Sequence, residues 1–130
     1  MSAESCRVVS AGAPGATSRG LDIAAGVSAE SVGATRICMQ LGVVPPGGAA
    51  EPHLHEGHET AIYVLEGRAG MDYGDALEHR LEAGPGDFVF IGAGVPHRPF
   101  NLSETEPVRY VAARTDPHED ESVVLLPHLR

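Results

Sequence analysis

The stretch HLHEGHETAIYVLEG, from His53 to Gly67, places three histidines and two glutamates directly before an apolar run that ends in a third glutamate and a glycine. His53 and His55 are two positions apart, so on an extended segment their side chains point to the same side. Two imidazoles on one side can share a metal ion at roughly 2.0–2.1 Å per bond. Imidazoles that face a core without a partner are costly to bury. The stretch therefore predicts part of a metal site followed by a β-strand.

With this stretch, the sequence resembles the cupin superfamily. The first cupin motif is a glycine, five residues, HxH, three or four residues, a glutamate, and a strand that ends in glycine. Here these positions are held by Gly47, His53, His55, Glu59 and Gly67. The match at this motif implies that further metal ligands come from the second motif.

The second cupin motif is matched by Gly86, Gly94, His97 and Asn101 at the required spacing. Gly92 stands where the motif has proline, a departure that concerns the rigidity of a turn more than metal binding. The two motifs cover about residues 47–101. The resemblance implies that His97 completes the metal site begun by the first motif.

The third ligand of the first motif is ambiguous. Six residues usually separate it from the closing glycine, and counting back from Gly67 in this way reaches Thr60. If Thr60 points inward, strand parity makes His58 inward and turns Glu59 to the opposite face. A bulge at the start of the strand would reverse that choice. Parity favours His58 over Glu59, so with the residues that the resemblance implies the four metal ligands are His53, His55, His58 and His97, and some cupins use four histidines.

The choice of ligand affects the chemistry of the metal. Four neutral imidazoles leave the full charge of a divalent ion uncompensated, which strengthens it as a Lewis acid. Such a site suits one divalent transition metal ion, with zinc or iron first and nickel, manganese or copper as alternatives. Glu59 is then the candidate catalytic residue, as a carboxylate that moves a proton or orients a ligating histidine. Alternatively, Glu59 forms only a surface contact.

The remaining sequence reads as short strands separated by glycine and proline turns. The segment from Arg36 to Val44 alternates with period two, and apolar strands follow over 60–65, 68–73, 77–81, 88–91 and 108–113. We expect one domain over 1–130, with a loosely structured N-terminal arm over 1–35 and a core barrel over 36–114. The resemblance implies an all-β fold, a double-stranded β-helix (cupin or jelly-roll barrel) with the metal near an open mouth.

Parity also nominates residues for the inner wall of this barrel. The apolar candidates are Met39, Leu41, Ile62, Val64, Phe88, Phe90 and Phe100. The polar candidates that could reach the cavity are Arg36, Gln40 and Tyr63.

The bulk properties limit the classes of partner. The 130 residues suffice for one domain, and the net charge of −9 opposes binding to nucleic acids and to anionic membranes. No apolar run is long enough to span a bilayer, and the N-terminus lacks the pattern of a signal peptide. Cys6 and Cys38 form no disulfide framework, so we expect a cytoplasmic protein.

Three functions fit this pattern. The first is a metal-dependent enzyme that acts on a small organic, aromatic or polyketide-like molecule by Lewis-acid and general-base chemistry. It would be a cyclase or isomerase, with an iron- or nickel-dependent dioxygenase as the alternative. The second is a cupin that binds a small ligand without turnover. The third is a structural barrel with a vestigial site, which the complete set of histidines disfavours. We also expect a homodimer, with the N-terminal residues and the apolar end SVVLLPHLR at its interface.

Overall fold

A computed structural model of the chain describes residues 6–17, 20–119 and 122–129. Within these ranges the helices are α1 (Ala29–Val32) and a 3-10 turn at Pro127–Leu129. The strands are β1 (Gly15–Ala16), β2 (Asp22–Val27), β3 (Cys38–Val44), β4 (His53–His55), β5 (Thr60–Glu66), β6 (Ala69–Tyr73), β7 (His79–Ala83), β8 (Phe88–Ile91), β9 (His97–Asn101), β10 (Val108–Arg114) and β11 (Val123–Leu125). No described helix is long and apolar enough to cross a membrane.

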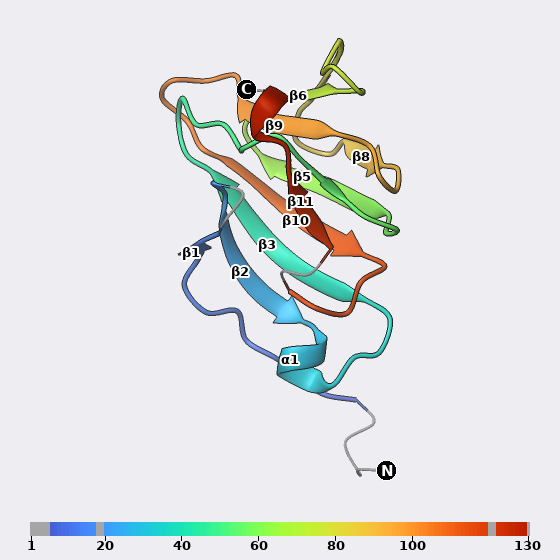
Figure 1. Ribbon diagram of the computed structural model, residues 1–130. Coiled ribbons are helices and arrows are strands. Elements are labelled where there is room, and N and C mark those ends of the chain that lie inside the picture. The colour runs from blue at the N-terminus through green and yellow to red at the C-terminus, as the bar shows by residue number, and fades with distance from the viewer. Residues whose placement is uncertain (1–5, 18–19, 120–121, 130) are drawn as a thin grey trace.

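The strands form two antiparallel sheets that face each other (Figure 1). One sheet has the order β1-β2-β3-β10-β5-β8, and the other has the order β11-β4-β9-β6-β7. Strands distant in the chain become neighbours, since β10 pairs with both β3 and β5. This arrangement confirms the all-β jelly-roll fold expected from the sequence.

Strand β3 has the expected period of two but the opposite phase. Cys38, Gln40 and Val44 are buried, whereas Met39 and Leu41 are exposed. The same reversal occurs in β8, where Phe88 and Phe90 face solvent and Ile91 is buried. A period of two defines a strand without deciding which of its faces is buried, so the expectation that these larger apolar residues face inward is wrong.

A glycine on the inner face of β3 leaves room for an aromatic ring from the neighbouring strand. Gly42 is the register partner of Tyr110 on β10. A Cβ atom at Gly42 would lie 2.0 Å from Tyr110 Cζ, so the phenol ring occupies the space above the glycine. Tyr110 belongs to a buried apolar cluster that is completed by Leu21, Val44, Ala50, Val108 and Ala112. At this level of the barrel, the ring from β10 therefore fills the space over β3.

Part of the N-terminal segment differs from the loose arm expected over 1–35. Strand β2 pairs with β3 along the six-stranded sheet, and Leu21 and Ala24 are buried. Ser28 caps α1, accepting a hydrogen bond from the Ser31 backbone. The small residues of β2 form no clear apolar pattern, so the sequence alone does not show that this segment pairs with β3. Residues 1–5 and 18–19 lie outside the described part of the chain.

The apolar C-terminal run also joins the barrel. Strand β11 pairs with β4, so that Val123 lies opposite His55 and Leu125 lies opposite His53. This pairing covers one edge of the strand that carries the first two histidines. The run therefore has a role within the chain, besides any role that it has between copies.

Candidate metal centre

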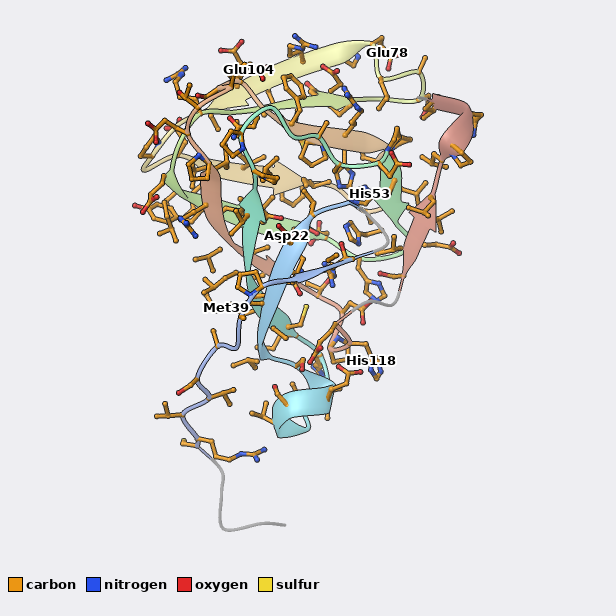
Figure 2. All side chains as sticks on the ribbon, turned by 90° about the vertical axis from the view of Figure 1, so that its left-hand side faces the viewer. Asp22, Met39, His53, Glu78, Glu104 and His118 are labelled. Atoms are coloured by element: carbon orange, nitrogen blue, oxygen red, sulfur yellow. The ribbon has the colours of Figure 1, made fainter. Side chains whose placement is uncertain are left out.

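Three buried histidines meet on the inner face of the five-stranded sheet. His53 and His55 lie on β4 and His97 lies on β9, where it is the register partner of His53. Their ligand nitrogens all lie within 4.8 Å of one another, and each residue is at most 4% exposed. Figure 2 shows His53 in the interior of the barrel. We call these three residues the histidine triad.

Backbone carbonyls fix the orientation of two rings of the triad. His53 Nδ1 lies 2.7 Å from the carbonyl oxygen of Glu51, and His97 Nδ1 lies 2.9 Å from that of Val95. A carbonyl oxygen only accepts, so each Nδ1 carries the proton and each Nε2 keeps its lone pair. Metal-ligating histidines are commonly held by such a hydrogen bond on the second nitrogen. The triad therefore fits a divalent transition metal, with Nε2 as the ligand atom of these two residues.

The structure does not bring His58 into this group, which differs from the four-histidine expectation. Its side chain is 33% exposed, and its Nδ1 lies 3.7 Å from Asp116 Oδ2. The reason is that β5 begins at Thr60, whereas residues 56 and 57 form a turn in which Gly57 has φ of 74°. Strand parity therefore does not extend back to His58.

Glu59 is also outside the cavity. Its side chain is exposed, while its backbone N–H donates to the hydroxyl of Thr115. Thr60 takes the inward position, is 4% exposed, and lines the cavity together with Ile62 and Val64. The parity expected for Thr60, Ile62 and Val64 is thus observed, and it turns Glu59 away from the triad.

The triad stands at one side of a cavity between the two sheets. Most of its wall is apolar and includes Leu21, Val44, Ile62, Val64, Met71, Leu81, Val89, Ile91, Phe100, Val108 and Tyr110. Besides the triad and the Tyr110 phenol, the polar side chains in the wall are Gln40, Thr60 and Arg114. No carboxylate of the described residues lines it. The arrangement offers a metal on one side and a largely water-excluding pocket beside it.

The expected inner wall is thus correct only in part. Ile62, Val64, Phe100 and Gln40 line the cavity. Arg36, Met39, Leu41, Tyr63, Phe88 and Phe90 do not.

Arg114 is a cavity residue that sequence reasoning missed, because the last strand was expected to end at residue 113. In the structure β10 extends to Arg114, in phase with buried Val108, Tyr110 and Ala112. The sequence VRYVAAR does not show this alternation clearly, because Val111 and Ala113 on the other face are apolar as well.

Comparison with known proteins agrees with this architecture. A family model described as the cupin domain matches residues 40–114. No curated protein sequence gives a significant match to the chain.

Two solved structures illustrate the structural similarity. The polyketide cyclase RemF from Streptomyces resistomycificus shares 30% sequence identity over 91% of this chain and 80% of that chain, with a TM-score of 0.68. The S161A mutant of Bacillus subtilis oxalate decarboxylase OxdC shares 21% identity over 87% of this chain, with a TM-score of 0.72. The present chain covers 29% of that decarboxylase chain, so it spans less than a third of its length.

Proposed function

Because the chain belongs to the cupin family, we propose that it is a metal-dependent enzyme acting on a small organic molecule. The observation that carries this proposal is the buried triad, with two ring orientations held by backbone carbonyls, on the wall of an apolar cavity. A purely structural barrel has no use for three converging imidazoles, whose burial without a ligand is costly.

The metal that we propose is zinc or iron, with nickel, manganese or copper as alternatives, because imidazole donors suit several of these ions. Its ligands are the triad, and Thr60 borders the same cavity. When bound, such an ion polarises a carbonyl or phenolic oxygen and lowers the pKa of a coordinated water. A site with three protein ligands leaves positions open for water or substrate, as catalytic zinc sites do.

The chain's own residues contribute binding and the exclusion of water. The apolar wall desolvates the carbon skeleton of a substrate, and this strengthens polar interactions at the triad side of the cavity. Glu59 is given no catalytic part in this proposal, since its side chain is exposed. The reaction that we propose is a cyclisation or isomerisation through an enolate, on an aromatic or polyketide-like substrate. The proton removed to form the enolate would pass to water or hydroxide held at the triad and return to the product. Similarity to RemF, a polyketide cyclase at 30% identity, supports this class of substrate.

Turnover with and without oxygen tests the proposal against its alternatives. The metal-loaded protein would be incubated with polyketide-like 1,3-dicarbonyl and phenolic compounds under air and under nitrogen, and products would be followed by chromatography. We expect conversion that does not depend on oxygen and is lost in His55→Ala. Oxygen uptake coupled to substrate loss would instead identify a dioxygenase. Binding without conversion by the fully metal-loaded protein would identify a ligand-binding cupin.

We also propose a homodimer in the cytoplasm. The outer face of the six-stranded sheet exposes apolar side chains from β3, β5 and β8, namely Met39, Leu41, Tyr63, Leu65, Phe88 and Phe90. Contiguous exposed apolar surface of this kind marks interaction sites, and a second copy presents the same surface. Light scattering should give twice the chain mass, and Phe90→Glu should give the mass of one chain. A monomeric mass for the wild type at micromolar concentration would contradict the dimer.

A further inference from the structure

Three polar side chains on the six-stranded sheet line the cavity that also contains the triad. We propose that Arg114, Gln40 and Thr60 form a subsite for an organic oxyanion, such as a carboxylate or an enolate, on the substrate. Its role in catalysis rests on the proposed function, whereas its binding of an anion can be measured without a metal. We call these three residues the oxyanion subsite.

Each of these side chains is buried and carries a polar atom that the protein leaves unsatisfied. Arg114 is 3% exposed, and Gln40 and Thr60 are each 4% exposed. Within the described residues, Arg114 Nε, Gln40 Oε1 and Thr60 Oγ1 have no hydrogen-bond partner. Buried polar atoms in native proteins are almost always satisfied, so three such atoms on one cavity wall indicate a place for ligand atoms.

The sheet register makes the three residues neighbours. Arg114 on β10 is the partner of Thr60 on β5, and Gln40 on β3 is the partner of Ala112, two residues before Arg114. Residues two apart on a strand share a face, so all three point inward at the same end of the sheet. The triad lies on the other sheet, and packed sheets are about 10 Å apart. A small molecule can therefore contact both groups at once.

Hydrogen bonds from the following loop hold the Arg114 guanidinium. Its Nη2 donates to the backbone carbonyl oxygens of Glu119 and His118, at 3.2 and 3.5 Å. Asp116 Oδ1 accepts from the His118 N–H at 3.0 Å and shapes the loop. The guanidinium is thus held from one side, which leaves Nε–H as the donor for a ligand.

Helix α1 in turn anchors this loop. The Ser28 hydroxyl donates to Glu119 Oε2 at 2.6 Å, and Glu30 accepts from the backbone N–H of Glu119 at 3.2 Å. His118 Nδ1 lies 2.8 Å from Glu30 Oε2, and this hydrogen bond lowers the pKa of the Glu30 carboxyl. Figure 2 shows His118 beside α1. The N-terminal segment therefore fixes the loop that holds the Arg114 side chain. A donor that is already held in place binds its ligand at a lower entropic cost.

The charge at this end of the cavity favours an anionic ligand. No carboxylate of the described residues lies within 4.0 Å of the Arg114 guanidinium, and the buried Asp116 carboxylate lies 3.7 Å from His58 Nδ1. A buried guanidinium stays protonated, so its charge needs a counter-charge or hydrogen bonds. Neutral imidazoles do not reduce the positive charge of a divalent ion. An ion bound by the triad would therefore attract an anion to the cavity together with Arg114.

The donors and acceptors define the ligand more narrowly. Arg114 Nε–H donates to an oxyanion, Gln40 Oε1 accepts from a neighbouring hydroxyl, and the Thr60 hydroxyl can do either. An oxyanion next to a hydroxyl matches this set, as in a hydroxy-substituted aromatic carboxylate. Salicylate is a suitable probe, and 2-hydroxybenzyl alcohol is its neutral counterpart.

Calorimetric titration of these probes tests the subsite, in metal-free and in zinc-loaded protein. Wild type should bind salicylate at least about tenfold more tightly than the neutral alcohol, because hydrogen bonds to charged groups are the strong ones. Arg114→Gln should weaken salicylate binding about 10- to 100-fold and leave the binding of the alcohol unchanged. The matched control is Arg109→Gln on the same strand, since Arg109 is half-exposed and pairs with Glu66 at 3.3 Å. This control should bind salicylate as wild type does.

Equal affinity of wild type for salicylate and the alcohol, or unchanged salicylate affinity in Arg114→Gln, would overturn the subsite. If circular dichroism shows that Arg114→Gln is unfolded, the shape-conserving Thr60→Val decides instead, with an expected loss of about 2- to 10-fold. Zinc content is measured on the same samples. If the wild type binds neither zinc nor any other transition metal after reconstitution, the metal-dependent function is refuted, while the metal-free titration still tests the subsite.

Discussion

Asn101 closes the second motif and, in the structure, supports a turn rather than the metal centre. It is 7% exposed, and its Nδ2 lies 2.7–3.2 Å from the carbonyl oxygens of Val44, Pro45 and Glu106. Its Oδ1 accepts from the Ser103 N–H at 2.8 Å. The two amide hydrogens satisfy two of the three carbonyls well, which makes three effective hydrogen bonds. At about 1 kcal/mol each, Asn101→Ala should lower the free energy of unfolding by about 3 kcal/mol.

Urea unfolding followed by circular dichroism measures this loss. Asn101→Asp should lose at least as much at neutral pH, because its carboxylate would face carbonyl oxygens that need a donor. Ser103→Ala is the control: the Ser103 hydroxyl accepts from two exposed backbone N–H groups that water can serve instead, so it should lose less than about 1 kcal/mol. Zinc content should stay at the wild-type value in all three variants. An Asn101→Asp variant as stable as wild type would refute this account of the residue.

Three further predictions follow from packing, electrostatics and ligand choice. Gly42→Ala should destabilise the fold by about 1–3 kcal/mol, because the new Cβ overlaps the ring of Tyr110; the cost should nearly vanish in a Tyr110→Leu background, and an equal cost there would contradict the overlap. The hydrogen bond from Arg80 lowers the pKa of Asp72 in the folded protein below its ordinary value of 3.8. The pair therefore stabilises the fold above pH 3.8, and this stabilisation is lost as the pH falls through the pKa of the folded state. Arg80→Gln should therefore lose less unfolding free energy than wild type between about pH 5 and pH 3, and equal losses would refute the assignment. His58→Ala should retain zinc and its thermal stabilisation by zinc, whereas loss of both would restore the four-histidine site.

The spacing of the two motifs predicted the fold class. It also predicted that His53, His55 and His97 lie together, as they do in the structure. His53 and His55 share a strand face, and the pairing of β9 with β4 places His97 beside them. These relations are local or follow from the family pattern, so the sequence carries them. The third ligand position depended on where β5 begins. Gly57, with its positive φ, makes a turn there, and strand parity does not apply to His58.

Other features depend on contacts between segments that are distant in the chain. The glycine at position 42 on the inner face of β3 matches the ring of Tyr110 from β10, which lies above it. The pairing of β2 depends on the edge of β3, because its small residues form no clear apolar pattern. The position of Arg114 in the cavity depends on one additional residue at the end of β10. Each of these features depends on contacts with a neighbouring strand, and the pattern of residues within one segment does not contain that information.

The metal content of the purified protein tests the central claim most directly. Elemental analysis of wild type, freshly purified and again after reconstitution with zinc or iron, should give about one equivalent per chain, because three buried imidazoles with two fixed rings form one site. His55→Ala, folded by circular dichroism, should hold less than about a tenth of that amount. A reconstituted wild type with less than about a tenth of an equivalent of any transition metal would contradict the metal centre.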